Sequence, residues 1–183
     1  MKREEAIELL KKHLKNKNLI KHCLAVGAIM KKIAERIGEN SKKWEIVGIL
    51  HDIDYEETKD DFSKHGILAG QILREYLDEE GLHAIKAHNY ENTGVEPMTK
   101  MDYALIASDS ISGLIVATAL VMPSKKLEEV KPKSVLKKFK QKDFARNVSR
   151  EKILFCEKLG FSLEEFINLS LDALKEISEE LGL

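Results

Sequence analysis

The 183-residue sequence has few prolines, which interrupt helices, and few cysteines, which can cross-link a fold. It contains three prolines, two cysteines and a single tryptophan. Two cysteines are too few for the disulfide framework of a small secreted domain or for a cysteine-rich zinc motif. Cys23 and Cys156 each lie within an apolar helical pattern, so we expect two reduced thiols in the protein core. The scarcity of proline leaves long segments free to form uninterrupted helices.

The sequence also lacks a large net charge and a clear membrane segment. A net charge of -1 argues against a protein that binds nucleic acid through bulk charge. The first residues, MKREEAIELLKK, lack the apolar run of a signal peptide. The longest apolar stretch, 104–122, contains Asp109, and a charged residue inside a membrane span costs roughly 2.5–3.5 kcal/mol. We therefore interpret this stretch as a buried core helix and expect a cytoplasmic protein with no membrane partner.

The remaining composition predicts one all-α domain. Hydrophobic residues make up 43% of the chain and charged residues 33%, which is typical of a globular protein of this length. Apolar residues recur at spacings of three and four, which is the periodicity of helices and not of strands. We predict a single domain, 1–183, with helices over 4–15, 18–37, 41–52, 64–77, 79–89, 99–121, 125–130, 133–140, 144–159 and 163–182.

Several helix ends have clear signals in the sequence. Gly38 is predicted to end the second helix in the left-handed conformation. Ser41 is the expected N-cap of the third helix, and Thr99 with Asp102 has the spacing of a capping box. A second capping box is expected at Ser162, three residues before a glutamate. Residues 53–63 between helices are unusually acidic, which normally indicates a solvated loop.

The segment WEIVGILHDIDYEE, residues 44–57, carries the strongest functional signal. Its apolar helix places adjacent His51 and Asp52 at a helix end, where two neighbouring side chains can bind one ion from different directions. Inside a core, the same two polar side chains would each need a partner. The simpler alternative is a helix that ends in two solvated polar residues.

Other histidines and one aspartate extend this candidate site. His22 lies on an apolar helix face, His65 and His88 lie near predicted helix ends, and Asp109 lies in a helix with little other polarity. Mixed nitrogen and oxygen ligands suit Fe, Mn, Zn or Ni better than Ca or Mg. Alternatively, Asp109 is a buried carboxylate bonded to serine or backbone groups. Two further histidines, His13 and His83, are expected to lie outside the site.

In order and spacing, these residues resemble the HD-domain superfamily of metal-dependent phosphohydrolases. Its signature of a His, a His-Asp pair and a distant Asp matches His22 in LIKHCLAVG, His51-Asp52 in GILHDID and Asp109 in ALIASDSISG. A binuclear subgroup adds two histidines, which correspond to His65 in SKHGILAG and His88 in IKAHNYENTG. The resemblance covers residues 18–122 as the metal-binding core. It does not extend to the predicted C-terminal helical extension, 123–183.

The resemblance implies an HD-domain helical bundle with additional C-terminal helices. It also implies two divalent transition metal ions, with Asp52 as a bridging catalytic carboxylate. The first ion would be bound by His22, His51 and Asp109 and the second by His65 and His88. Together the ions would activate a water and bind the phosphoryl oxygens of a phosphoester. The expected substrate is a small phosphorylated compound, with a nucleotide as the first choice.

One departure from the family pattern leaves the subfamily open. Several members of the binuclear subgroup have HD-I-G, whereas this chain has Asp54 at the position of that glycine. The exact subfamily, and with it the substrate, is therefore not fixed by the resemblance.

Two basic features are candidates for binding an anionic substrate. Lys86 lies two residues before His88 and offers a charge for a phosphate, although a solvated lysine on an exposed helix is the favoured interpretation. Residues 124–152 carry 11 Lys and Arg against 4 Asp and Glu. This basic segment is either a solvated face or a contact for a nucleotide or an RNA backbone. With only Phe139 and Phe144 as aromatics it is a poor stacking surface, so RNA is less favoured.

Two other functions remain compatible with the same residues. A di-iron oxygenase on a related fold would use a similar set of ligands, and oxygen uptake during turnover would distinguish it from a hydrolase. A non-catalytic regulator would use the site to sense a metal or a ligand. Ligand-induced thermal stabilisation without turnover would identify that role.

Overall fold

The computed structural model describes all 183 residues and contains helices but no strands, which confirms the predicted all-α class. The N-terminal elements are α1 (Arg3–His13), α2 (Lys17–Ile37), α3 (Ser41–Leu50), α4 (Tyr55–Thr58), η1 (Phe62–Lys64), α5 (Ile67–Leu73), α6 (Glu79–Ala87) and α7 (Tyr90–Thr93). The remaining elements are α8 (Lys100–Leu120), η2 (Leu127–Glu129), α9 (Pro132–Lys140), α10 (Arg150–Ile153), η3 (Leu154–Leu159), α11 (Leu163–Glu176) and α12 (Ser178–Leu181).

The capping signals of the long helices are confirmed. Gly38 ends α2 in the left-handed region with φ 78°. Thr99 and Asp102 form a capping box at the start of α8. Ser162 forms the equivalent box with Glu165 at the start of α11. These ends were predictable because a cap depends on residues that are close together in the sequence.

Several predicted boundaries were wrong. The helix expected over 163–182 is divided into α11 and α12. The helix expected over 64–77 begins at Ile67, because His65 is extended and Gly66 has φ 87°, a left-handed value that glycine adopts without strain. The helix expected over 144–159 begins at Arg150, after a turn-rich segment. The N-cap of α3 is Asn40 and not Ser41, since the Asn40 side chain accepts a hydrogen bond from the Lys43 amide.

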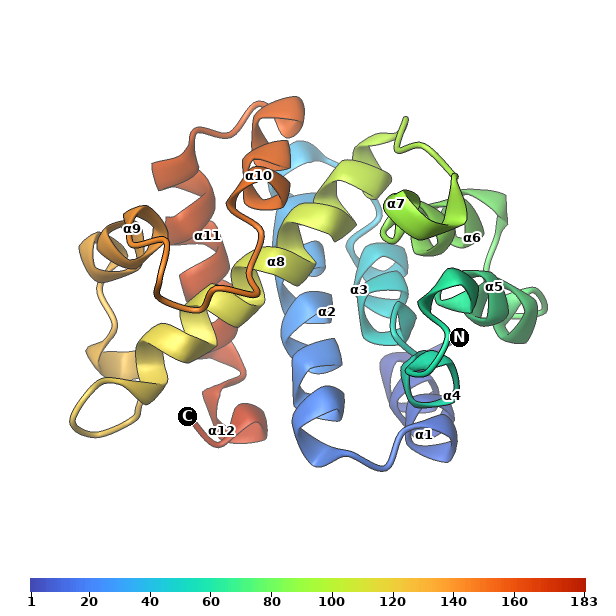
Figure 1. The fold of residues 1–183 in the computed structure, drawn as a ribbon, viewed down its shortest axis with the longest axis horizontal. Coiled ribbons are helices and arrows are strands. Elements are labelled where there is room, and N and C mark those ends of the chain that lie inside the picture. The colour runs from blue at the N-terminus through green and yellow to red at the C-terminus, as the bar shows by residue number, and fades with distance from the viewer.

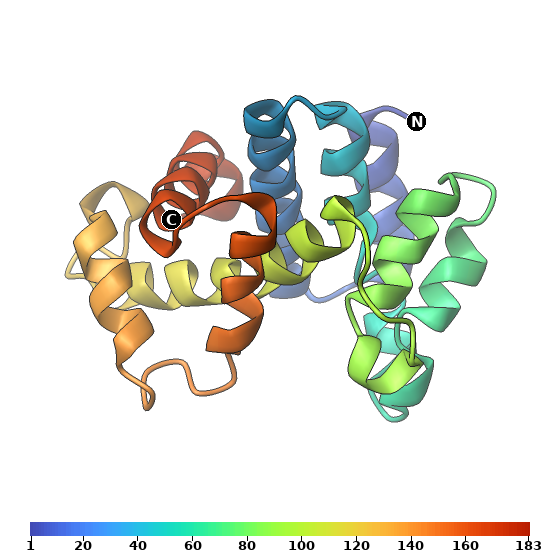
Figure 2. The same cartoon turned by 90° about the horizontal axis from the view of Figure 1, so that it is seen from above.

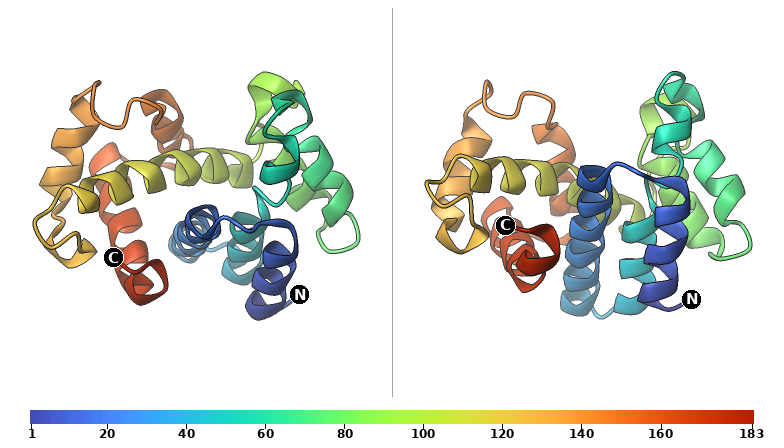
Figure 3. Two further views of the ribbon diagram at one scale, coloured as in Figure 1. Left: turned by 60° about the horizontal axis from the view of Figure 1, so that its bottom comes forward. Right: turned by 90° about the horizontal axis from the view of Figure 1, so that it is seen from below.

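α8 runs through the middle of the molecule and connects its two sides. α1 to α7 gather in one half of the molecule and the helices after residue 123 in the other, and α8 passes through both halves (Figures 1 and 2). The two views of Figure 3 show the same division, with α8 spanning the width of the molecule. α8 is long and apolar enough to cross a membrane, but 61% of its apolar window is buried inside the fold, as expected for a core helix.

A single hydrophobic core joins both sides of the molecule. Its buried residues extend from Ala6 in α1 to Leu181 in α12, and both cysteines are free thiols within it. At the crossing of α2 and α3, a Cβ added to Gly48 would lie 2.7 Å from the Cα of Gly27. Only two glycines permit this close approach, and it brings the helices that carry His22 and His51 together.

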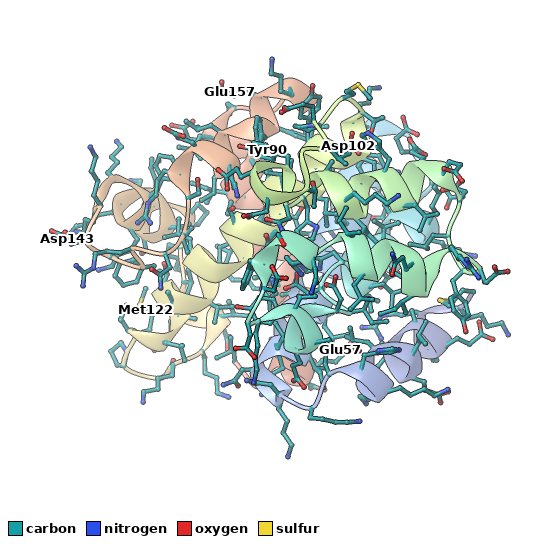
Figure 4. All side chains as sticks on the ribbon, turned by 45° about the vertical axis from the view of Figure 1, so that its right-hand side comes forward. Glu57, Tyr90, Asp102, Met122, Asp143 and Glu157 are labelled. Carbon is teal, nitrogen blue, oxygen red and sulfur yellow. The ribbon has the colours of Figure 1, made fainter.

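Acidic residues after α3 connect this side of the fold to α1. Glu56 accepts hydrogen bonds from the amides of Lys15 (2.9 Å) and Asn16 (2.7 Å), at the junction between α1 and α2. Glu57, labelled in Figure 4, lies 3.1 Å from Nδ1 of His13. His13 therefore has a structural contact in place of the purely exposed position that the sequence predicted. Part of the acidic segment therefore makes tertiary contacts, whereas Asp60 and Asp61 are exposed as the sequence predicted.

Candidate metal centre

The six predicted metal ligands converge at one place, which we call the metal centre. They are His22 from α2, His51 and Asp52 after α3, His65 before α5, His88 at the end of α6 and Asp109 from α8. His51, Asp52, His65 and His88 are buried. The side chains of His22 and Asp109 are 26% and 33% exposed, so one side of the centre is open.

Asp52 lies between the four histidines of the metal centre. Its Oδ1 lies 3.4 Å from Nε2 of His51, 3.2 Å from Nε2 of His65 and 3.4 Å from Nε2 of His88. Its Oδ2 faces the other way and lies 3.7 Å from Nε2 of His22. On that side, Asp109 Oδ1 is 3.0 Å from His22 Nε2 and 3.8 Å from His51 Nε2.

These positions define two groups of donor atoms that share Asp52. One group is His22, His51 and Asp52, and the other is Asp52, His65 and His88. Ligand atoms that surround one ion at roughly 2.1 Å lie about 3.4 Å apart in tetrahedral geometry. The observed separations of 3.1–3.7 Å from Asp52 and between His65 and His88 therefore fit donor atoms directed at common cations.

Each histidine is oriented through its other ring nitrogen. Nδ1 of His51 donates to the Gly48 carbonyl (2.7 Å), and Nδ1 of His88 donates to the carbonyl of Ile85. Nδ1 of His22 lies 3.2 Å from the Ser112 hydroxyl, which itself donates to the Asp109 carbonyl (2.8 Å). With Nδ1 occupied in this way, Nε2 presents a lone pair, which is the usual arrangement of metal-binding histidines. His51 Nε2 is buried without a hydrogen-bond partner, as expected of an atom that binds a cation.

The carboxylates and imidazoles shift each other's pKa. Burial lowers the pKa of His51, but Asp52 and Asp109 outweigh it and raise that pKa to about 9. Burial also opposes protonation of His65, yet Asp52 and Asp54 raise its pKa to about 10. Against the effect of burial, the neighbouring histidines hold the pKa of Asp52 well below its ordinary value. A cation that binds here therefore has to displace protons from imidazoles.

Asp54 orients His65, a role that the sequence did not predict. It is fully buried, and its Oδ1 accepts from Nδ1 of His65 at 2.8 Å. Its Oδ2 accepts from the amides of Gly66 and Ala69, both at 2.8 Å. A glycine at this position, as in HD-I-G, has no side chain to make these bonds. The departure from the family pattern is thus part of the support for His65.

Replacing Asp54 with asparagine tests this role. One oxygen of the amide would still accept from the two backbone N–H groups, so its NH2 group would face His65 Nδ1. His65 would then have to carry its proton on Nε2, the atom needed as a ligand. We expect binding of the cation at His65 to weaken by about 10- to 100-fold, the usual cost of losing such a partner.

Metal titration of purified protein measures this effect, with Asp60→Asn as the control on an exposed residue of the same segment. Equal affinity in Asp54→Asn and the unaltered protein would show that Asp54 does not control His65.

A cavity of about 370 Å³ opens onto the metal centre. Besides the ligands it is lined by Leu19, Tyr55, Phe62, Asn89 and Lys152. Asn89 donates to the carbonyls of Phe62 (3.2 Å) and His65 (3.0 Å), and so holds the segment before α5 against α6. Phe62 is 41% exposed, which leaves an aromatic face at the rim.

Lys86, the lysine chosen from the sequence, does not line this cavity. Its side chain lies over α5, where a Cβ added to Gly70 would be 2.8 Å from the Lys86 Cε. The cavity cation is Lys152, from the end of the basic segment 124–152. Sequence spacing favoured Lys86 because it is close to His88, whereas Lys152 is brought in by a contact between distant segments.

His83 lies away from the metal centre, as predicted. Its Nδ1 is 3.0 Å from Oδ2 of Asp102, the buried capping-box carboxylate of α8. Asp102 also accepts from the amides of Met98 (2.8 Å) and Thr99 (2.9 Å), so this pair supports the start of α8.

The fold and the centre define an all-α bundle with a histidine-rich site around one shared aspartate. The HD domain family matches residues 19–119, more than half of the chain. The chain therefore belongs to the HD-domain family. Every ligand of the metal centre lies within the matched segment, and Lys152 lies outside it.

Curated relatives of the chain carry the name Ribonuclease Y. The protein from Sulfurovum sp. is 26% identical over 168 residues, and the one from Thermotoga petrophila is 28% identical over 173 residues. Both alignments cover 90% of this chain but 32% of the relative. The protein from Lawsonia intracellularis is 30% identical over 97 residues, covering 52% of this chain and 18% of the relative. No solved structure matches the chain.

Proposed function

We propose that this protein is a metal-dependent phosphohydrolase that cleaves a phosphoester of a small phosphorylated compound, with a nucleotide as the favoured substrate. The observation that carries the proposal is Asp52, which belongs to both groups of candidate ligands and lines a cavity. Its Oδ1 lies near His51, His65 and His88, and its Oδ2 faces His22. Membership of the HD-domain family supports it. We place the activity in the cytoplasm, consistent with two free buried thiols.

The residues of the chain have distinct roles in this proposal. His22, His51 and Asp109 would hold one cation, His65 and His88 a second, and Asp52 would bridge them. Divalent cations of this kind polarise phosphoryl oxygens and lower the pKa of a bound water. The partners of the Nδ1 atoms keep each imidazole in its binding orientation, so little reorganisation is needed during reaction.

The cavity supports a substrate with both a phosphate and a planar group. The phosphate would lie against the metal centre, and the exposed ring of Phe62 at the rim offers a face for a base to stack on. A cavity of about 370 Å³ is near the lower end of the range for sites that enclose small molecules. A mononucleotide therefore fits this space better than a folded macromolecule.

The relatives support a second candidate, hydrolysis of a phosphodiester in RNA. Their name, Ribonuclease Y, describes proteins of which this chain covers at most 32% among the three compared above. An RNA end could enter the open side of the centre, where His22 and Asp109 are partly exposed. Both candidate reactions attack a phosphoryl group at the metal centre. They differ in the rest of the substrate, because an RNA chain would extend outside the cavity and a nucleotide would not.

A metal-by-substrate screen on protein of measured metal content tests the proposal. We expect phosphate release from one or more nucleoside phosphates, and no cleavage of a single-stranded RNA labelled at one end. RNA cleavage with no nucleotide turnover would transfer the assignment to the second candidate. Oxygen uptake would indicate an oxygenase, and thermal stabilisation by nucleotides without turnover would indicate a sensor.

A further inference from the structure

Lys152 is the one lysine that lines the cavity at the metal centre. It belongs to α10, outside the segment that matches the HD family. Its side chain is 22% exposed, and its Nζ donates to Oε2 of Glu91 at 3.0 Å. The ammonium group has three N–H donors, and this is its one hydrogen bond within the protein. Two donors are therefore available to a ligand in the cavity.

The position of Lys152 is fixed by its neighbours in the chain. The Ser149 hydroxyl caps α10 and accepts from the Lys152 amide at 3.2 Å. The guanidinium of Arg150 donates to six backbone carbonyls of the preceding segment, those of Lys138, Phe139, Gln141, Phe144, Ala145 and Val148. This network holds the turn-rich segment before α10 in one shape, and the start of α10 with it.

Aromatic contacts attach α10 and η3 to α7 and α8. The Phe155 ring lies 6.3 Å from the ring of Tyr90 and 5.8 Å from that of Tyr103. The Nζ of Lys152 lies 5.4 Å from the centre of the Tyr90 ring. Figure 4 shows Tyr90 beside the C-terminal segment that carries Glu157. Lys152 thus stands between α7 and the cavity, on a rigid support.

We infer that Lys152 binds the anionic phosphoryl group of the substrate, and that Glu91 holds this lysine in place until the anion replaces it. The inference rests on the proposed function, because it assumes a phosphorylated ligand at the metal centre. On this inference, the C-terminal extension, 123–183, contributes a substrate-binding residue to the metal centre. A carboxylate partner and a phosphate compete for the same ammonium donors, so the Glu91 contact weakens phosphate binding.

The competing role for Lys152 is structural, as a tether between α10 and α7 through Glu91. The two roles predict opposite effects of changing Glu91. If Lys152 binds phosphate, Glu91→Gln removes the competing negative charge and strengthens phosphate binding. If Lys152 is a tether, Glu91→Gln weakens the contact that Lys152→Ala removes, and so weakens phosphate binding in the same direction.

The experiment measures binding of inorganic phosphate to protein loaded with its metals, by titration calorimetry. Lys152→Ala and Lys152→Gln should each weaken phosphate binding by about 10- to 100-fold, the usual loss for a charge-assisted hydrogen bond. Glu91→Gln should strengthen it by about two- to fivefold. The double variant should match Lys152→Ala. The control is Lys142→Ala, which removes the same charge from an exposed position in the basic segment.

Circular dichroism and metal content confirm that each variant is folded and loaded. Unchanged phosphate affinity in both Lys152 variants would overturn the inference, as would parallel weakening by Glu91→Gln or an unaltered protein that binds no phosphate. The predicted pattern of affinities without turnover of any phosphoester would keep the inference and remove the proposed function. Turnover with unchanged phosphate affinity in the Lys152 variants would do the reverse.

Discussion

Asp109→Ala should abolish phosphoester hydrolysis and remove a metal ion from the protein. Asp109 Oδ1 is 3.0 Å from His22 Nε2 and faces the open side of the centre. Without Asp109, the first cation would keep His22, His51 and the shared Asp52 as ligands. One negative charge beside that cation would be lost. Loss of an electrostatic stabiliser of this kind costs about 10²–10³ in rate, and loss of the cation itself costs more. Metal analysis and rate assays on the same preparation measure both effects.

Asp102→Ala is the matched control for this variant. Asp102 belongs to the same helix, but its Oδ2 accepts from the amides of Met98 and Thr99 at the start of α8 and lies beside His83. Its replacement should lower thermal stability and leave metal content unchanged. If Asp109→Ala behaved in the same way, with full metal content and lower stability, Asp109 would be a structural carboxylate and not a ligand.

His65→Ala and His88→Ala should separate the two halves of the centre. Both histidines contact Asp52 through Oδ1 and lie on the opposite side from His22. We expect each variant to retain about one metal ion per chain, whereas the unaltered protein should bind two. Activity should nevertheless fall by at least about a hundredfold, since the second cation would stabilise the attacking or departing oxygen. Metal content and kcat on the best substrate are the two measurements.

His83→Ala is the control for these two histidine variants. It makes the same chemical change next to Asp102, away from the centre, and should affect stability but neither metal content nor rate. Replacement of any of His22, His51 or Asp52 should instead remove the cation that every form of the mechanism requires. A His65→Ala or His88→Ala protein that keeps two metals and most of its activity would contradict the two-metal proposal.

The sequence alone predicted the candidate ligands of the metal centre and the class of the fold. Helix periodicity depends on residues within one or two turns, and so do the caps at Gly38, Thr99 and Ser162. His51 and Asp52 are adjacent in the chain, and the order of the other ligands matched a known family. All six predicted ligands converge in the structure.

Only the tertiary structure decided which groups hydrogen-bond to those candidate ligands and which lysine lines the cavity beside them. The partner of His22 is Ser112, 90 residues away, and contact between α2 and α3 depends on two glycines that carry no motif. Asp54 stood out in the sequence as a departure from a pattern, and its function became visible once His65 and two amides were seen around it. The lysine that lines the cavity is Lys152 and not Lys86, and this too depends on a contact between segments that are distant in the sequence. Contacts of this kind depend on how helices cross, which local sequence patterns do not encode.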